Sequence, residues 1–123
     1  MKRMFYNYTE GVEIEIVDRL VSVYSALTSN DVEHKVASIR TSTTTFLDKS
    51  QHQDIFHLIH SLALQANNDA YGFHIDDIEA CQFGLYEESA KGHYTWHIDF
   101  KGFNETQDKK MRKISVVIQL SEP

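Results

Sequence analysis

The amino-acid sequence predicts an α+β fold built as one domain over residues 1–123. Two stretches in the first half have apolar residues at helical spacing, and the apolar period changes to two residues in the second half. The chain has one proline and five glycines, so it offers no Pro/Gly-rich linker between domains. We therefore expect N-terminal helices packed on one side of an antiparallel β-region.

The first helix is predicted over Glu13–Ser29. Its apolar side chains recur every three or four residues and form one stripe, which consists of Val17, Leu20, Val21, Tyr24 and Leu27. Acidic residues lie near its start, where the positive end of the helix dipole stabilises them. The sequence Asn30-Asp31 predicts its end, and the short aromatic stretch Met4–Tyr8 before it is expected to be a strand.

A second helix is predicted after an extended segment. Val36–Leu47 is rich in β-branched residues, which favours a strand. Ser50 is expected to cap the helix, with Gln53 completing a capping box. The buried stripe consists of Ile55, Phe56, Leu58, Ile59, Leu62 and Ala66. Asn67-Asn68 should end the helix, so the helical part spans about residues 12–68.

Three strands are expected over about residues 78–121, namely Ile78–Tyr86, Gly92–Phe100 and Lys113–Leu120. The loop Glu87–Lys91 is short enough for a hairpin between the first two. The last strand is apolar, and nothing follows it to pair with it or cover it. We therefore expect that part of the domain is missing.

Composition and charge exclude several classes of protein. The formal charge of −6 disfavours a large nucleic-acid interface, and the basic stretch Lys109–Lys113 fits a solvated loop. A single cysteine, Cys81, cannot form an internal disulfide, which points to the cytoplasm. No apolar run approaches the length of a membrane span, and Met1–Glu10 lacks the apolar region of a secretion signal.

The residues that suggest chemistry are His97 and Asp99. In a strand, alternate side chains share a face, which here holds His93, Thr95, His97 and Asp99 on one side and Tyr94, Trp96, Ile98 and Phe100 on the other. The second set is apolar and should pack under the helices. A histidine and an aspartate two residues apart can converge on one metal ion, as in the facial triad of non-heme Fe(II) oxygenases. The spacing alone equally fits a surface pair on a polar sheet face.

Two other candidate sites are weaker. His57 and His60 lie three residues apart on the second predicted helix, and His52 or Asp54 could complete a zinc site. No cysteine or acidic cluster supports that site, so a polar helix face is the preferred interpretation. Cys81 has no basic residue beside it in sequence and is interpreted as a small buried side chain.

Residues 39–123 resemble a known family in four passages. These are Ile39-Arg40-Thr41-Ser42 with Phe46-Leu47; Gln65-Ala66-Asn67 with Tyr71-Gly72-Phe73; Gln82–Tyr86 with Gly92-His93-Tyr94 and His97-Ile98-Asp99; and Arg112–Ser121. The combination is similar to prolyl 4-hydroxylase-like, Fe(II)- and 2-oxoglutarate-dependent oxygenases, in particular the PKHD-type hydroxylases of bacteria and phages. About two thirds of the chain takes part in the resemblance.

The resemblance implies a fold and an activity. The helices would pack on a double-stranded β-helix (jelly-roll) core, of which this chain holds the first strands. His97 and Asp99 match the first two iron ligands, and Tyr86 matches a tyrosine of the 2-oxoglutarate pocket. Tyr94 and Gln119 match positions that line the pocket, although a core role for Tyr94 stays equally open. The implied dioxygenase uses Fe(II), 2-oxoglutarate, O₂ and ascorbate to hydroxylate a peptide or protein residue, with a prolyl residue as the expected target, and releases succinate and CO₂.

The sequence departs from this family after Asp99. The resemblance implies a second histidine as third ligand, and a following arginine or lysine that binds the far carboxylate of 2-oxoglutarate, yet no histidine follows His97. We expect the chain to be the front part of a longer enzyme, or to be completed by a second chain, and to be inactive alone. The alternatives are a non-catalytic oxygenase-like module that binds a partner through its helices, and a cupin-like metal protein without 2-oxoglutarate.

Overall fold

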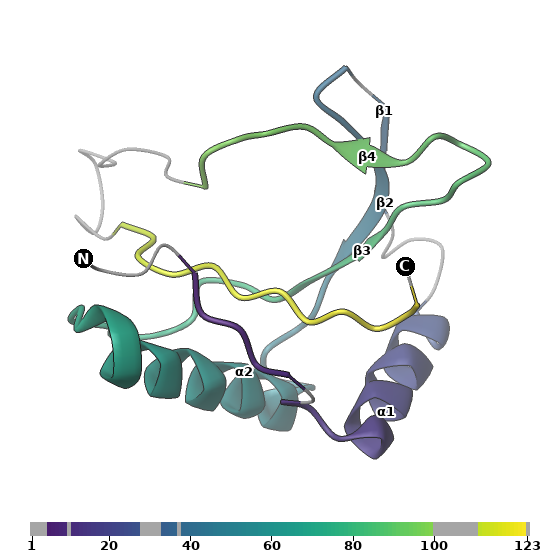
Figure 1. The fold of residues 1–123 in the computed structure, drawn as a ribbon. Coiled ribbons are helices and arrows are strands. Elements are labelled where there is room, and N and C mark those ends of the chain that lie inside the picture. Colours follow the sequence, from purple (N-terminus) through teal and green to yellow (C-terminus); the bar gives the residue numbers. More distant parts are fainter. Residues whose placement is uncertain (1–4, 10, 28–32, 37, 100–110, 123) are drawn as a thin grey trace.

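The computed structural model describes residues 5–9, 11–27, 33–36, 38–99 and 111–122. Their elements in order are α1 (Ile14–Ser25), β1 (Glu33–Val36), β2 (Arg40–Phe46), α2 (Gln53–Ala66), η2 (Asn67–Tyr71), β3 (Gln82–Leu85) and β4 (His93–Tyr94). Figure 1 shows the two helices together at one end of the molecule, with the sheet rising above them. Both predicted helices are therefore present.

The helix α1 buries a narrower stripe than predicted. Leu20 is 4% exposed and reaches the core, and partly buried Val23, Tyr24 and Leu27 pack around that core. Val21, expected in the stripe, is 42% exposed. The helix ends at Ser25, with the N–H of Ala26 donating to the Ser22 carbonyl at 3.1 Å. The apolar spacing thus predicts the helix, but not whether each of its side chains is buried.

The start of α2 differs from the predicted capping box. The helix begins at Gln53, and its N-cap is His52, which makes no side-chain capping bond. Ser50 instead belongs to a turn organised by Asp48, whose Oδ1 accepts the Ser50 N–H at 2.8 Å and the Ser50 hydroxyl at 2.5 Å. The prediction that Ser50 caps the helix is wrong because Asp48 satisfies both donors of Ser50.

The α-helix α2 ends where predicted, at Ala66 with Asn67 as its C-cap. The chain then continues as a π-helical turn over Asn67–Tyr71, which the prediction did not include. The Asn67 side chain holds this turn by donating to the Phe73 carbonyl and accepting the Phe73 N–H, each at 2.8 Å. Gly72 then ends it in the left-handed region at φ 68°, where glycine carries no penalty for a side chain.

The antiparallel sheet is organised around β2. β1 pairs with Thr41–Thr44, β3 pairs with Thr43–Phe46, and β4 pairs with Arg40–Thr41. Because Thr41, Thr43 and Thr44 each have a partner on both sides, β3 and β4 lie one after the other along the edge opposite β1. The predicted hairpin between these two strands is therefore wrong, since both face β2 and not each other.

A closed loop separates β3 from β4. The Glu87 carbonyl accepts the Gly92 N–H at 2.8 Å, and the Glu88 carbonyl accepts the Lys91 N–H at 2.9 Å. With Lys91 at φ 52°, this is the bonding pattern of a Schellman motif. A Cβ on Gly92 would lie 2.7 Å from the Glu87 nitrogen, so glycine is required at the base of the loop.

Several predicted strand residues lie outside any strand. β4 ends at Tyr94, and the last backbone bond to this edge runs from Thr95 N to Ile39 O at 2.8 Å. Trp96 is fully exposed and Ile98 is 84% exposed, so the prediction that they pack under the helices is wrong. Pleated alternation does not extend beyond the end of the strand. Phe100 lies outside the described residues.

The two terminal segments run extended without joining the sheet. Residues 5–8 and 111–120 are assigned to no strand, so the predicted strands Met4–Tyr8 and Lys113–Leu120 do not form in the described part of the chain. Figure 1 shows both segments crossing the space between the helices and the sheet. Val117 is 86% exposed, as expected for a segment whose outer side no described element covers.

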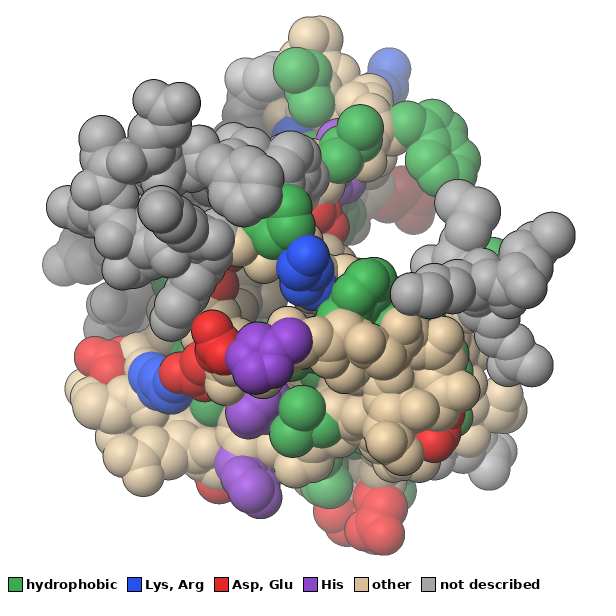
Figure 2. Space-filling model, turned by 90° about the vertical axis from the view of Figure 1, so that its left-hand side faces the viewer, with side chains coloured by type: hydrophobic (Ala, Val, Ile, Leu, Met, Phe, Trp, Pro, Cys, Tyr) green, Lys and Arg blue, Asp and Glu red, His purple; other side chains and the backbone are tan. Residues whose placement is uncertain are grey.

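The core lies where the helices meet the lower end of β2 and β3. It consists of Leu20, Leu47, Ile55, Phe56, Cys81 and Phe83. Cys81 is buried, as expected, and this burial raises the pKa of its thiol. The face in Figure 2 carries acidic and histidine side chains on the lower, helical part of the molecule. Neither described helix combines the length and apolar character needed to cross a bilayer.

Candidate metal centre

His97 and Asp99 approach each other just beyond the end of β4. His97 Nε2 lies 3.1 Å from Asp99 Oδ1, and the two side chains are 33% and 44% exposed. The pair is therefore open to a ligand from solvent. The expected convergence occurs although these residues follow the strand and do not lie in it.

The hydrogen bonds of His97 restrict the protonation of its ring. Nδ1 lies 2.8 Å from the carbonyl oxygen of Thr95, which can only accept, so Nδ1 carries the proton of that bond. Nε2 then faces a carboxylate oxygen that is also an acceptor when ionised. Two states satisfy this geometry: an imidazolium, or a neutral ring whose Nε2 lone pair shares a cation with Asp99.

Two residues of the segment 111–122 form hydrogen bonds to Asp99. Ser115 Oγ donates to Asp99 Oδ2 at 2.6 Å, and Arg112 Nη1 donates to the Asp99 backbone carbonyl at 3.3 Å. The Ser115 hydrogen bond is the main cause that lowers the pKa of Asp99, followed by His97 and Arg112. The lowered pKa favours the ionised carboxylate, which suits a cation ligand.

Arg112 is itself anchored by Glu79. Its Nη2 donates to Glu79 Oε1 at 2.9 Å and its Nε donates to Glu79 Oε2, and these contacts raise the pKa of the guanidinium. Sequence reasoning did not assign Ser115, Arg112 or Glu79 to the site. For Arg112 and Ser115 the only signal was the resemblance of the passage Arg112–Ser121, and for Glu79 there was none, because these contacts arise through tertiary structure.

Aromatic rings complete the surroundings of His97. The Tyr94 ring stacks on the His97 ring with centroids 3.6 Å apart and planes 13° apart. This contradicts the expectation that Tyr94 and His97 point to opposite faces, because the chain leaves the sheet between them. The Arg40 guanidinium lies 4.6 Å from the centroid of Tyr94 and 5.8 Å from that of Tyr86. Tyr86 and Tyr94 thus lie beside Arg40, and His97 stacks on Tyr94.

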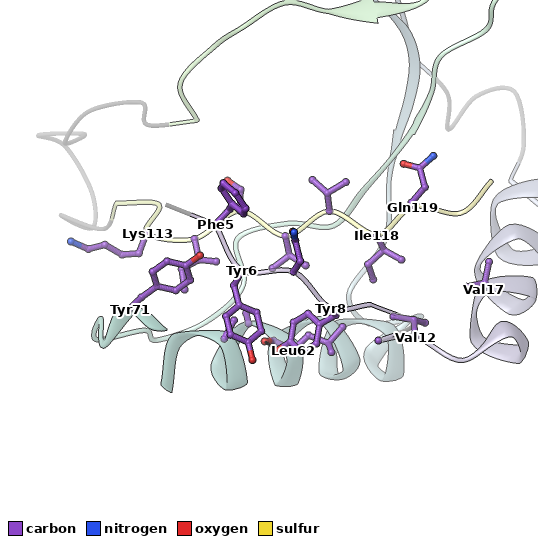
Figure 3. Close-up of a pocket in the computed structure, with 18 residues that line it drawn as sticks. Phe5, Tyr6, Tyr8, Val12, Val17, Leu62, Tyr71, Lys113, Ile118 and Gln119 are labelled. Atoms are coloured by element: carbon purple, nitrogen blue, oxygen red, sulfur yellow. Dashed lines mark hydrogen bonds between the residues drawn. The ribbon is translucent and has the colours of Figure 1, made fainter. Parts of the chain in front are cut away.

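Gln119 lies in different surroundings. Its amide donates to the Ser121 carbonyl at 3.1 Å, and it lines a cavity of about 590 Å³ between α2, the N-terminal segment and residues 113–119. Figure 3 shows aromatic side chains of the N-terminal segment and of Tyr71 along this cavity. His97, Asp99, Tyr86 and Tyr94 do not line it. Ser115, which binds Asp99, does line it, so the cavity adjoins the candidate metal centre at that residue.

The chain contains two further His-x-Asp sequences, His52-Gln53-Asp54 and His74-Ile75-Asp76, which sequence reasoning did not compare with His97-Ile98-Asp99. His74 Nε2 lies 3.0 Å from Asp76 Oδ1, but the His74 side chain is 93% exposed. The two-residue spacing therefore brings a histidine and an aspartate together without any site around them. The His97–Asp99 pair differs from this pair by its hydrogen bonds to Thr95 and Ser115 and by its stacking on Tyr94.

A complete ligand set is not present among the residues that the structure describes. No group of three or more His, Cys, Asp or Glu side chains there could hold a metal ion. This includes the alternative zinc site on α2, where the Nε2 atom of His60 is buried without a hydrogen-bond partner. His97 and Asp99 are therefore a two-ligand arrangement within the described residues.

Comparison with known proteins gives no relative: no family model, no curated protein and no solved structure matches this chain. The family resemblance rests on the residues of the chain itself.

Proposed function

We propose that this chain holds the first two iron ligands, His97 and Asp99, of a 2-oxoglutarate-dependent oxygenase of the prolyl 4-hydroxylase type. The observation that carries the proposal is the 3.1 Å separation of His97 Nε2 and Asp99 Oδ1 in a pair that Thr95 and Ser115 orient by hydrogen bonds. Two atoms that bind one metal ion at about 2.1 Å in adjacent positions lie about 3 Å apart. The two donor atoms would therefore need little movement to share an ion.

The donor chemistry also fits a ferrous ion. An imidazole nitrogen and a carboxylate oxygen are the ligands of the 2-His-1-carboxylate sites of non-heme iron oxygenases. The Thr95 carbonyl accepts from His97 Nδ1 and so leaves Nε2 as the metal-binding nitrogen. Ser115 occupies Asp99 Oδ2, and Oδ1 remains available. Both ligand atoms are presented by groups that a neighbouring residue orients.

The remaining residues have supporting roles in this proposal. Fe(II) with 2-oxoglutarate and O₂ supplies the oxidising power that hydroxylates a carbon centre and yields succinate and CO₂. Tyr94 fixes the plane of the His97 ring by stacking, and Tyr86 forms a wall of the co-substrate pocket beside Arg40. The assignment of Gln119 to the 2-oxoglutarate pocket rests on the family resemblance alone.

The proposed substrate is a peptide or protein residue, with proline as the target, and the proposed compartment is the cytoplasm. A third histidine ligand and a basic residue for the far carboxylate would come from outside these 123 residues. A core of jelly-roll type is part of the same proposal. It would give the extended segment 111–122 the strand partners that the described residues do not provide.

The test is metal binding under anaerobic conditions. Fe(II) is titrated into the protein while the fluorescence of Trp96, the single tryptophan, is recorded; Trp96 precedes His97 and is fully exposed. We expect His97→Ala and Asp99→Ala to weaken Fe(II) binding by about 10-fold or more. The matched controls are His74→Ala and Asp76→Ala, which remove the exposed His74–Asp76 pair and should leave binding unchanged.

A second titration tests the co-substrate. 2-Oxoglutarate added to the Fe(II)-loaded protein should produce the visible charge-transfer absorption of an Fe(II)–2-oxo acid chelate, and His97→Ala should abolish it. Metal binding without any effect of 2-oxoglutarate would favour the cupin-like alternative. A folded protein that takes up no Fe(II), or one in which the His74 and His97 variants behave alike, would refute the proposed metal centre and favour a partner-binding module.

A further inference from the structure

The segment 111–122 touches the candidate metal centre at two points, and both points are on Asp99. Ser115 binds the side chain of Asp99, and Arg112 binds its backbone carbonyl. The Thr95 N–H donates to the Ile39 carbonyl, and this is the last backbone hydrogen bond between this stretch and the β2 edge. Residues 97–99 follow it. The backbone of the pair is therefore held by side chains of another segment, and not by the sheet.

Ser115 fixes which oxygen of Asp99 is available. A carboxylate turns broadly about its terminal torsion, so the side chain alone does not choose between its two oxygens. The 2.6 Å bond from Ser115 Oγ is short and charge-assisted, and it occupies Oδ2. Oδ1 is left facing His97 Nε2 at 3.1 Å. The Ser115 hydroxyl thus fixes the rotation of the Asp99 carboxylate, so that Oδ1 points toward His97 Nε2.

Arg112 fixes the backbone that carries this carboxylate. Two of its nitrogens engage Glu79 in the segment before β3, and Nη1 remains for the Asp99 carbonyl at 3.3 Å. The fork geometry of a guanidinium permits this three-way contact, which a lysine could not reproduce. Three chain segments therefore meet at Arg112.

We infer that Ser115 and Arg112 are positioning residues that hold Asp99 in the orientation in which it shares a cation with His97. This inference rests on the proposed metal centre and deepens it, because it makes cation affinity depend on the segment 111–122. Loss of such a partner to a metal ligand typically weakens metal binding about 10- to 100-fold. We expect this range for Ser115→Ala and a smaller loss for Arg112→Lys.

The experiment titrates Co(II) alone, an oxygen-stable substitute for Fe(II), into the protein and follows Trp96 fluorescence. Ser115→Ala should weaken Co(II) binding about 10- to 100-fold, and Ser115→Thr, which keeps the hydroxyl, should restore it. Ser121→Ala is the matched control, since Ser121 lies on the same exposed segment and its hydroxyl makes no contact with Asp99. Thermal unfolding midpoints of the three variants should agree with that of the wild type within a few degrees. Equal affinity of wild type and Ser115→Ala would overturn the inference.

A metal-free measurement separates this inference from the proposed function. NMR spectra of the apoprotein report the Asp99 carboxyl carbon and the ring nitrogens of His97. Ser115→Ala should shift these signals, whereas Ser115→Thr and Ser121→Ala should not. If the wild type binds no Co(II) yet Ser115→Ala shifts the signals, only the proposed metal centre fails. If the signals stay in place, the positioning role is refuted whether or not metal binds.

Discussion

Substitution of Gly92 tests the loop that leads into the candidate site. In Gly92→Ala the new Cβ would lie 2.7 Å from Glu87 N and 2.8 Å from both the Cα and the carbonyl carbon of Tyr86. All three atoms belong to the backbone, so no flexible side chain can move aside. Overpacking of this kind costs about 1–3 kcal/mol, and the stiffer unfolded chain of alanine returns about 0.4–1 kcal/mol. We expect a net loss of about 1–2 kcal/mol in the free energy of unfolding.

Gly72 provides the comparison that separates crowding from backbone conformation. It has φ 68°, and no atom lies within 4 Å of the position that a Cβ would take, so Gly72→Ala costs only the left-handed conformation. That conformation costs alanine about 1–2 kcal/mol, from which the gain from the stiffer unfolded chain is again subtracted. Gly92 is not among the glycines with positive φ, so its loss arises from contact alone.

The assay is urea unfolding with Trp96 fluorescence and circular dichroism recorded together. A third variant, the double substitution of Gly72 and Gly92, should lose the sum of the two single values, because the sites share no contact. The loop geometry is wrong if Gly92→Ala is as stable as the wild type. It is also wrong if Gly92→Ala alters the m value while Gly72→Ala does not, since the change would then lie in compactness and not in local crowding.

Three further outcomes are expected. Lys91→Gly should raise the free energy of unfolding by about 0.5–1 kcal/mol, because Lys91 has φ 52° at the position where a Schellman motif favours glycine; a loss in urea unfolding would contradict this. His60→Leu should raise it by about 1 kcal/mol by removing a buried nitrogen without a partner, whereas a destabilised variant would mean that His60 has a partner. The pKa of Asp48 is lowered mainly by the Ser50 hydroxyl, so this carboxylate stabilises the fold above its unfolded value of 3.8 and the contribution is lost as the pH falls through the lower folded pKa. Thermal unfolding between about pH 5 and about pH 2 should therefore show a smaller loss of stability in Asp48→Asn than in the wild type.

Local patterns in the sequence were enough to place both helices and β2. The apolar spacing around Leu20 and around Ile55 selects one face of each helix, and both residues are buried. The β-branched run predicts the strand β2, but not the burial of the adjacent residues Thr44 and Thr45, at 1% and 2% exposure. The helices and this strand depend on neighbours in sequence, which a pattern can detect.

Features that depend on distant partners were not predictable in the same way. Trp96 and Ile98 follow the alternation of a strand, but β4 ends at Tyr94 and both are exposed. The convergence of His97 and Asp99 was predictable because they lie two positions apart along the chain. His74 and Asp76 also converge, although His74 is exposed, so such convergence is not selective. The contact of Ser115 with Asp99 bridges 16 positions and arises only from folding.

The pairing of β3 and β4 with β2 has a consequence for how the length of this region can change. Thr43 faces Leu85, so an unbroken edge would place Tyr86 opposite Ser42 and residue 87 opposite Thr41; His93 stands there instead, and 93 − 87 = 6. Residues 87–92 are thus a six-residue insertion into one edge strand, and an even number preserves the side of the sheet on which each side chain falls. Shortening or lengthening this loop by an even number of residues would leave the alternation of the strand before His97 unchanged, so related chains could differ in length here without moving His97 and Asp99.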